Sequence, residues 1–351
     1  MRSGVAQRAF PGAVLLVAQE GAVVFEKAYG TADLFRQVPV SEETCFDLAS
    51  LTKPLATALA AMLLVQDARL DLDRPCGLYD RSLTASDKAD LTCRQLLRHC
   101  AGLPAFRPYF MRLRQIPRTE RRAHFMRWLI REPLRAEPGV RTEYSDLGFL
   151  LLQRVIESIT HEKLDRFLLE SAYRPLGIER LFFPVTPNRP AEVEFAATEL
   201  CPLRGRLLKG EVHDDNADAI GGVGGHAGLF GTARGVYALL QVLLDCDRGG
   251  GTAKFIDPII VRHFFEHGKD TNWTLGFDTP AAAGSSSGRF FGPRSVGHLG
   301  FTGTSFWMDR DRALIVILLT NRVHPSRYNT KIRAFRPLLH DAVFTALSDR
   351  N

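Results

Sequence analysis

The stretch FDLASLTKPLATALAAMLL, residues 46–64, places a serine and a lysine three residues apart where an apolar helix is predicted to begin. On a helix, residues i and i+3 share a face, so the Ser50 hydroxyl and the Lys53 ammonium come within contact reach. If Ser50 is the N-cap, Pro54 falls in the first turn, where backbone N–H groups have no helical partner and a proline is tolerated.

This pairing suits a nucleophile. The positive end of the helix would favour an oxyanion beside Ser50. A lysine that is desolvated, or that lies next to another cation, has a lowered pKa and can accept the serine proton. The pattern S-x-x-K is weak evidence alone, because a chain of this length contains about one match by chance. A capping serine with a solvated lysine is the alternative.

Length and charge limit the other possibilities. A chain of 351 residues suggests two domains, or one large domain with an insertion. Hydrophobic residues make up 45% and charged residues 24%, as in globular proteins with a sizeable core. The net charge of +6 comes mainly from scattered arginines, and their one cluster, residues 112–135, predicts an amphipathic helix with a solvated basic face. Because no nucleic-acid fingerprint accompanies it, we expect no nucleic-acid partner.

The six cysteines form no C-x-x-C pair and no metal-ligand spacing, so we expect free thiols and no metal site. No long apolar run precedes the Pro11-Gly12 turn, so a signal peptide is not predicted. No window approaches the roughly 18 uninterrupted apolar residues of a membrane span. The chain as written therefore predicts a cytoplasmic protein, or a periplasmic one if a leader was removed.

Strand patterns occur at both ends of the chain and helical patterns between them. Residues 12–30 predict a hairpin that turns at Glu20-Gly21, and residues 295–323 predict a second one that turns at Arg310-Asp311. The predicted fold class is α/β (α+β), with one antiparallel sheet built from both chain ends, flanked by helices and carrying a mostly helical insertion. We expect a sheet domain of residues 1–54 and 215–351, an inserted domain of residues 55–214, and an active site in the cleft between them.

Three other functional patterns fail on their context. GSSSG at 284–288 matches a nucleophile elbow, but no strand precedes it and no helix follows it, so we predict a loop. GVGGHA at 222–227 follows a polar segment rather than a strand, which argues against a dinucleotide site. A calcium loop starting at Asp214 would have Ala219 at the turn glycine and Gly225 at the final carboxylate.

Five motifs in chain order resemble the serine β-lactamase and DD-peptidase superfamily. The likeness is to its class C-like branch, which includes penicillin-binding proteins of low molecular weight, D-aminopeptidases and serine esterases. It extends over nearly the whole chain. The motifs are SLTK at 50–53, LLRHCAGLP at 96–104, YSDLGFLLL at 144–152, GGHAGLFGTA at 224–233 and GHLGFTGTSFW at 297–307.

The resemblance implies roles for particular residues. Ser50 would be the acylated nucleophile, and Lys53 would accept its proton together with Tyr144. Tyr144 would then carry a proton to the leaving group as general acid. The backbone N–H groups of Ser50 and Phe301 would form the oxyanion hole.

Residues implied in substrate binding are Asp146 and, on the strand side of the cleft, His298, Gly300 and Thr302. Here the chain departs from the family pattern. The third motif reads H-L-G rather than K-T-G, and a histidine supplies a cation only when it is protonated. Leu299 also removes a hydroxyl, so efficient β-lactamase activity is not expected.

The tyrosine motif ends in Asp146 where the family has asparagine. A carboxylate beside Lys53 would raise the lysine pKa and work against a neutral base. Pairing of Asp146 with His298 or with an arginine would offset this effect. The sequence leaves these arrangements open.

These features predict a serine hydrolase that needs no metal or cofactor and acts on a small-molecule or peptide substrate. The leading hypothesis is a β-lactamase-like, penicillin-binding enzyme of the D-Ala-D-Ala carboxypeptidase type. The alternatives on the same fold are a short-chain carboxylesterase and a D-aminopeptidase. A ligand-binding domain without catalytic activity is the alternative from another class.

Overall fold

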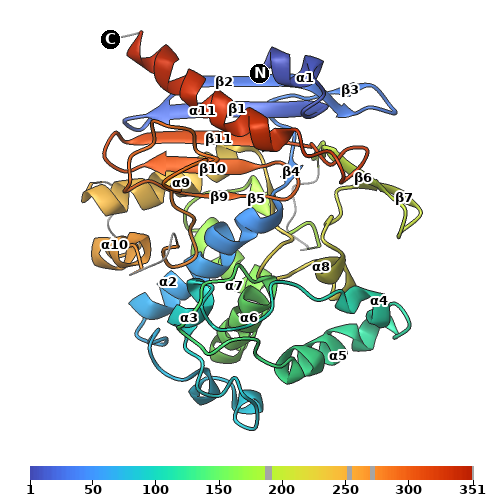
Figure 1. The fold of residues 1–351 in the computed structure, drawn as a ribbon, viewed down its shortest axis with the longest axis vertical. Coiled ribbons are helices and arrows are strands. Elements are labelled where there is room, and N and C mark those ends of the chain that lie inside the picture. Colours follow the sequence, from blue (N-terminus) through green and yellow to red (C-terminus); the bar gives the residue numbers. More distant parts are fainter. Residues whose placement is uncertain (186–191, 251–254, 269–272, 350–351) are drawn as a thin grey trace.

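A six-stranded antiparallel sheet joins the two ends of the chain in the computed structural model, which describes residues 1–185, 192–250, 255–268 and 273–349 (Figure 1). The strand order is β3-β2-β1-β11-β10-β9. The strands are β1 (Gly12–Gln19), β2 (Ala22–Asp33), β3 (Val38–Pro39), β9 (Val296–Leu299), β10 (Ser305–Asp309) and β11 (Leu314–Thr320). Because β1 pairs with β11, the N-terminal and C-terminal strands form one sheet, as predicted.

The first predicted hairpin is confirmed in detail. Glu20 and Gly21 connect β1 to β2, with φ angles of 50° and 80°. Two consecutive residues with positive φ are typical of a two-residue hairpin turn whose twist matches that of the strands. The second predicted hairpin, β10 to β11, is also present.

Both faces of the sheet are covered, because successive side chains on a strand point to opposite sides. Leu15 and Val17 pack with helix α11 (Ile332–Ser348) on one face, beside the short α1 (Arg2–Ala6). Val14 and Leu16 belong to the larger cluster on the other face, against α9 (Ala233–Arg248). Figure 1 shows α11 running across the sheet.

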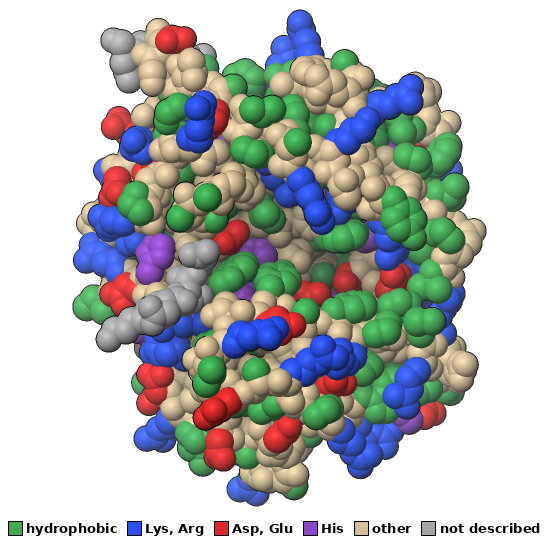
Figure 2. All heavy atoms as spheres, viewed as in Figure 1, with side chains coloured by type: hydrophobic (Ala, Val, Ile, Leu, Met, Phe, Trp, Pro, Cys, Tyr) green, Lys and Arg blue, Asp and Glu red, His purple; other side chains and the backbone are tan. Residues whose placement is uncertain are grey.

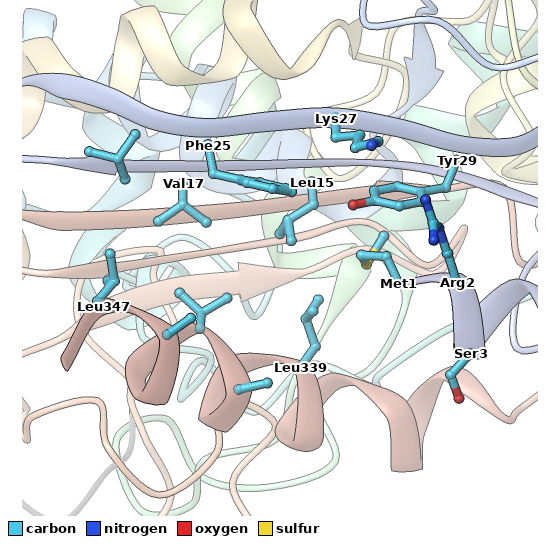
Figure 3. A pocket seen from close by; sticks show the side chains of 14 residues that line it. Met1, Arg2, Ser3, Leu15, Val17, Phe25, Lys27, Tyr29, Leu339 and Leu347 are labelled. Atoms are coloured by element: carbon cyan, nitrogen blue, oxygen red, sulfur yellow. The ribbon is translucent and has the colours of Figure 1, made fainter. Parts of the chain in front are cut away.

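An apolar cavity of about 540 Å³ lies between α11 and the sheet (Figure 3). Leu15, Val17 and Phe25 of the sheet and Leu339 and Leu347 of α11 line it. None of the predicted site residues contributes to this cavity, so it is separate from the nucleophile.

Helices and two small sheets make up the rest of the described chain. The remaining α-helices are α2 (Leu59–Gln66), α3 (Cys93–Leu97), α4 (Tyr109–Leu113), α5 (Arg118–Arg131), α6 (Asp146–Thr160), α7 (Leu164–Leu168), α8 (Asp215–Ala219) and α10 (Pro258–Phe265). The shorter turns are η1 (Ala49–Leu51), η2 (Lys53–Ala58), η3 (Cys76–Leu78), η4 (Arg81–Leu83) and η5 (Leu169–Tyr173). The small sheets are β4 (Phe46–Asp47), β8 (Phe230–Gly231) and β5 (Leu181–Phe182), and β6 (Ala197–Cys201) with β7 (Arg206–Lys209).

The predicted basic helix over 112–135 is shorter than expected. Helix α5 begins at Arg118 because Pro117 lies at its N-cap, and α4 ends before that point. Phe125, Met126 and Leu129 are its buried residues, which confirms an amphipathic helix.

The turns η1 and η2 and the helix α2 form one continuous helical segment, called the central helix, inside the protein. The run Ala49–Gln66 is the one helix among the described residues that is long and apolar enough to cross a membrane, and 83% of it is buried inside the protein. Such burial is that of a core helix. The core cluster around it draws residues from both predicted domains, and the boundaries at 54/55 and 214/215 stay predictions.

Leu59→Ala should destabilise the protein by about 3 kcal/mol, because it opens a cavity in the central helix. Leu59 is fully buried, whereas Leu338 on α11 is 69% exposed. Urea denaturation of both alanine variants measures the difference. Leu338→Ala should change the free energy of unfolding by less than about 0.5 kcal/mol. Equal losses would contradict the placement of the central helix.

Candidate active site

The segment before Ser50 is held in a strained conformation. Ala49 has a φ of 47°, which is unfavourable for a residue with a side chain. The buried Asp47 carboxylate accepts the backbone N–H of Ala49 at 2.8 Å and that of His213 at 2.7 Å. Strain of this kind persists only where the surroundings impose it, and it is common at functional sites.

The turn after β9 fixes the same segment from the strand side. Thr302 Oγ1 donates to the Asp47 carbonyl at 2.7 Å, and Thr304 Oγ1 donates to the Leu48 carbonyl at 3.1 Å. A Cβ on Gly300 would come within 2.7 Å of that Leu48 oxygen, so the close approach requires glycine. Gly300 and Thr302 therefore position the nucleophile segment, and the Thr302 hydroxyl proton is committed to Asp47.

Ser50 is not the N-cap of the helix. It is the middle residue of the 3₁₀ turn η1, whose N-cap is Leu48. Pro54 follows in η2, a stretch of π-helix. The wider turn accommodates a residue that lacks an N–H and whose ring would crowd the carbonyl four residues earlier.

Two backbone donors near the nucleophile are free. Within the described residues, neither the N–H of Ser50 nor that of Phe301 donates a hydrogen bond to another protein group. The turn that carries Phe301 is pinned against the Ser50 segment by the contacts described above. Two unpaired N–H groups in such a position can receive an oxyanion.

The Lys53 side chain is fully buried and fully bonded. Its ammonium donates to Ser50 Oγ at 3.3 Å, to Asp146 Oδ1 at 2.6 Å and to the His226 carbonyl at 3.3 Å. The Tyr144 ring centroid lies 4.6 Å from Nζ. A lysine ammonium has three N–H donors, and each has an acceptor here.

Asp146 decides the protonation state of this lysine. Burial alone would lower the pKa of Lys53, but the negative charge of Asp146 and the contacts with Tyr144 outweigh it and hold the pKa above its ordinary value. The carboxylate pairs with Lys53 rather than with His298 or an arginine, the two arrangements that would have offset this effect. Lys53 is therefore a cation in the resting site at neutral pH.

Tyr144 reaches the same point from the start of α6. Its ring lies over the Lys53 ammonium, and burial raises its pKa although the Lys53 charge opposes the change. Ser145 is the N-cap of α6, and its hydroxyl accepts the Gly148 N–H at 3.1 Å. The structure thus brings Ser50, Lys53 and Tyr144 into one cluster.

His99 was missed as a site residue, although it lies in the motif LLRHCAGLP. Its Nδ1 accepts the Ser145 N–H at 3.1 Å, and its ring centroid is 4.6 Å from that of Tyr144 and 4.7 Å from that of Trp273. Burial, with the Lys53 charge second, lowers its pKa well below the ordinary value. His99 is therefore neutral, and its ring packs against the ring of Tyr144.

His298 is also neutral, which corrects the expectation of a conditional cation on the strand side. Burial, and then the charge of Lys53, lowers its pKa to about 3. Nδ1 lies 2.9 Å from the Leu299 carbonyl, so the neutral ring carries its proton there. Nε2 is buried without a partner in the described structure. His298 can accept a hydrogen bond but supplies no positive charge.

Comparisons with known proteins identify the family of this chain. The family model described as Beta-lactamase matches residues 1–339. The chain belongs to the beta-lactamase family. This match confirms the resemblance that the five motifs indicate. It also supports a serine hydrolase.

Two relatives within this family cover most of the chain. A protein of Salmonella enteritidis PT4 named "Putative D-alanyl-D-alanine carboxypeptidase" is 30% identical over 355 residues, which are 92% of this chain and 81% of that protein. An Escherichia coli K12 protein of the same name is 30% identical over 344 residues, 90% of this chain and 79% of that protein.

Solved structures show the same fold at lower identity. An octameric penicillin-binding protein homologue from Pyrococcus abyssi matches with a TM-score of 0.73 and 21% identity, over 96% of this chain and 75% of that one. EstCE1, a hydrolase with promiscuous acyltransferase activity, matches with a TM-score of 0.73 and 23% identity, over 95% and 96% of the two chains.

The expected location of the active site, in a cleft between two domains, stays a prediction. Figure 2 shows a hollow on one face, between the sheet above and the helices below, with acidic side chains inside it. In Figure 1, β4 and the start of the central helix run through the same level. Within the described ranges, no group of three or more His, Cys, Asp or Glu side chains could hold a metal ion.

The glycine-rich motif GGHAGLFGTA contributes a second polar pair beside Lys53. His226 Nε2 lies 2.9 Å from Asp214 Oδ1, while the His226 carbonyl accepts from Lys53. Despite its burial, the pKa of Asp214 is held below its usual range by His226. Asp214 is also the N-cap of α8, where its side chain accepts the Ala217 N–H.

The elbow, dinucleotide and calcium patterns that failed on their sequence context also lack the structural context of such sites. GSSSG at 284–288 lies in a loop without a following helix, and GVGGHA at 222–227 follows α8 rather than a strand. Asn216 of the rejected calcium loop instead joins two parts of the chain: its Oδ1 accepts the Phe110 N–H at 3.0 Å and its Nδ2 donates to the Arg107 carbonyl at 2.8 Å.

Asp146→Asn should move the acid limb of kcat/KM to lower pH by about one to two units, for an uncharged ester substrate. Lys53 accepts a proton only when it is neutral, so its raised pKa places that limb at high pH in the wild-type protein. Removing the carboxylate lowers the lysine pKa and increases the neutral fraction at any given pH. The pH profile of hydrolysis measures the shift, and an unmoved limb would show that Lys53 is not the titrating base.

Proposed function

We propose that this member of the beta-lactamase family works through an acyl-enzyme at Ser50, formed with a small amide or ester and then released by water. The observation that carries the proposal is the 3.3 Å contact of Lys53 Nζ with Ser50 Oγ, with the Tyr144 ring centroid 4.6 Å from the same Nζ. The names of the Salmonella and Escherichia relatives support a D-Ala-D-Ala carboxypeptidase type of substrate.

In the proposed reaction, Ser50 Oγ attacks the carbonyl carbon and its proton passes to neutral Lys53. The backbone N–H groups of Ser50 and Phe301 receive the oxyanion. Tyr144, whose ring centroid lies 4.6 Å from Lys53 Nζ, relays the proton to the leaving group. A water molecule then attacks the ester, loses its proton along the same route, and Ser50 is restored.

A short-chain carboxylesterase or a D-aminopeptidase is the second candidate. It is favoured by the neutral His298 on the strand side, because a carboxypeptidase substrate brings a terminal carboxylate. A binding domain without catalytic activity is disfavoured, because Lys53 contacts both the Ser50 hydroxyl and the Tyr144 ring. Inertness to every acylating reagent would support that last alternative.

Ser50→Ala should lower kcat by about 10⁴-fold or more, since no other group can form the acyl-enzyme. Hydrolysis of p-nitrophenyl acetate and of a D-Ala-D-Ala peptide measures the loss, and the thermal midpoint checks that the fold is intact. Retained turnover in a folded variant would exclude the proposed nucleophile.

Lys53→Met and Tyr144→Phe should each lower kcat by about 10²- to 10⁴-fold, because each removes one carrier of the serine proton. Methionine fills the buried space of the lysine stem, and phenylalanine keeps the ring that packs on His99. Steady-state kinetics with matched circular dichroism spectra test both variants. A change below threefold in either would remove that residue from the mechanism.

A further inference from the structure

Asp146 keeps an unused acceptor in the candidate active site. Its Oδ1 lies 2.6 Å from Lys53, whose side chain has no exposed surface, while the Asp146 side chain retains 20% exposure. No donor among the described residues bonds to the second oxygen, Oδ2. The carboxylate thus holds the buried lysine with one oxygen and leaves the other available to a ligand.

No cationic side chain in the described part of the site is free to bind a substrate carboxylate. Lys53 is buried and bonded, and burial keeps His99 and His298 neutral by lowering their pKa values. Arg322, on the strand side beside Phe301, donates to three backbone carbonyls. A substrate carboxylate would therefore lack a partner, whereas a positive group would find one.

We propose that the substrate carries an ammonium group next to its scissile carbonyl and that Asp146 Oδ2 receives this group. The inference rests on the proposed acyl-enzyme at Ser50. The carboxylate lies two short contacts from the nucleophile, 3.3 Å from Ser50 Oγ to Lys53 Nζ and 2.6 Å from Nζ to Oδ1. An α-ammonium lies two bonds from the carbonyl carbon. Amides and esters of amino acids with a free amino group fit this spacing. The inference therefore selects the aminopeptidase candidate over the carboxypeptidase one, whose scissile carbonyl lies next to an uncharged amide nitrogen.

The bound ammonium would also activate the base. The ammonium partly neutralises Asp146 and so lowers the pKa of Lys53. The lysine then loses its proton to solvent before Ser50 attacks. Neutral Lys53 then takes the Ser50 proton, and Tyr144 relays it to the leaving group. The other titratable groups that face Lys53 are Tyr144, His99 and His298, all uncharged at neutral pH. Asp146 is a positioning residue that couples substrate binding to the base.

The test compares D-alanine p-nitroanilide with N-acetyl-D-alanine p-nitroanilide, in the wild-type protein and in Asp146→Asn. The ratio of kcat/KM for the free amine to that for the acetylated substrate should fall about tenfold or more in the variant. In the wild-type protein, the preference should vanish as the pH rises past about 8, where an α-amino group loses its proton.

Two further variants separate charge from structure. Asp146→Glu keeps a carboxylate and should retain most of the preference. Asp73→Asn removes an exposed carboxylate paired with Arg94 and should leave the ratio unchanged. The p-nitrophenyl esters of the same two amino acids replace the anilides if these are not cleaved.

An unchanged ratio in Asp146→Asn, or a wild-type preference for the acetylated compound at every pH, would overturn the inference, as would failure to cleave either ester. The proposed function has a different point of failure. Turnover of both substrates by folded Ser50→Ala would refute the acyl-enzyme, whatever the ratio shows.

Discussion

The buried contact between Lys53 and Asp146 is the constraint on which the site depends. An ammonium without solvent exposure is stable only beside a compensating charge, because burial of an unpaired ion costs several kcal/mol. That charge comes from the first residue of α6, so the central helix and α6 must meet at their N-terminal ends. Tyr144 lies two residues before Asp146 and is thereby brought to Ser50. One ion pair accounts for the meeting of all three proposed catalytic residues.

The same ion pair makes the site nearly neutral in its resting state. Lys53 and Asp146 cancel, and burial removes the charge of His99 and His298. Affinity for a substrate would then depend on groups that the ion pair leaves free, among them Asp146 Oδ2, His298 Nε2 and the two backbone N–H donors. This arrangement favours a cationic or neutral substrate over an anionic one.

Much of this structure could be predicted from local patterns. The hairpin at Glu20-Gly21 follows from turn chemistry, and the proximity of Ser50 and Lys53 follows from helical spacing. The strand patterns at both ends of the chain predicted the sheet that the two ends form. The position of Ser50 in the middle of a 3₁₀ turn could not be predicted, because it depends on contacts of Asp47 with residues distant in sequence, such as Thr302. Nor could the charge of His298 be known, since it depends on burial among residues far apart in sequence.

The central claim is that Ser50 becomes acylated, and intact-mass spectrometry tests it most directly. The protein is mixed with p-nitrophenyl acetate, quenched in acid at short times and digested for peptide mapping, beside folded Ser50→Ala as control. The account predicts a transient gain of one acetyl group on the peptide that contains Ser50, and none on that peptide in the variant. Turnover without an adduct on Ser50, or an equal adduct in the variant, would contradict the account.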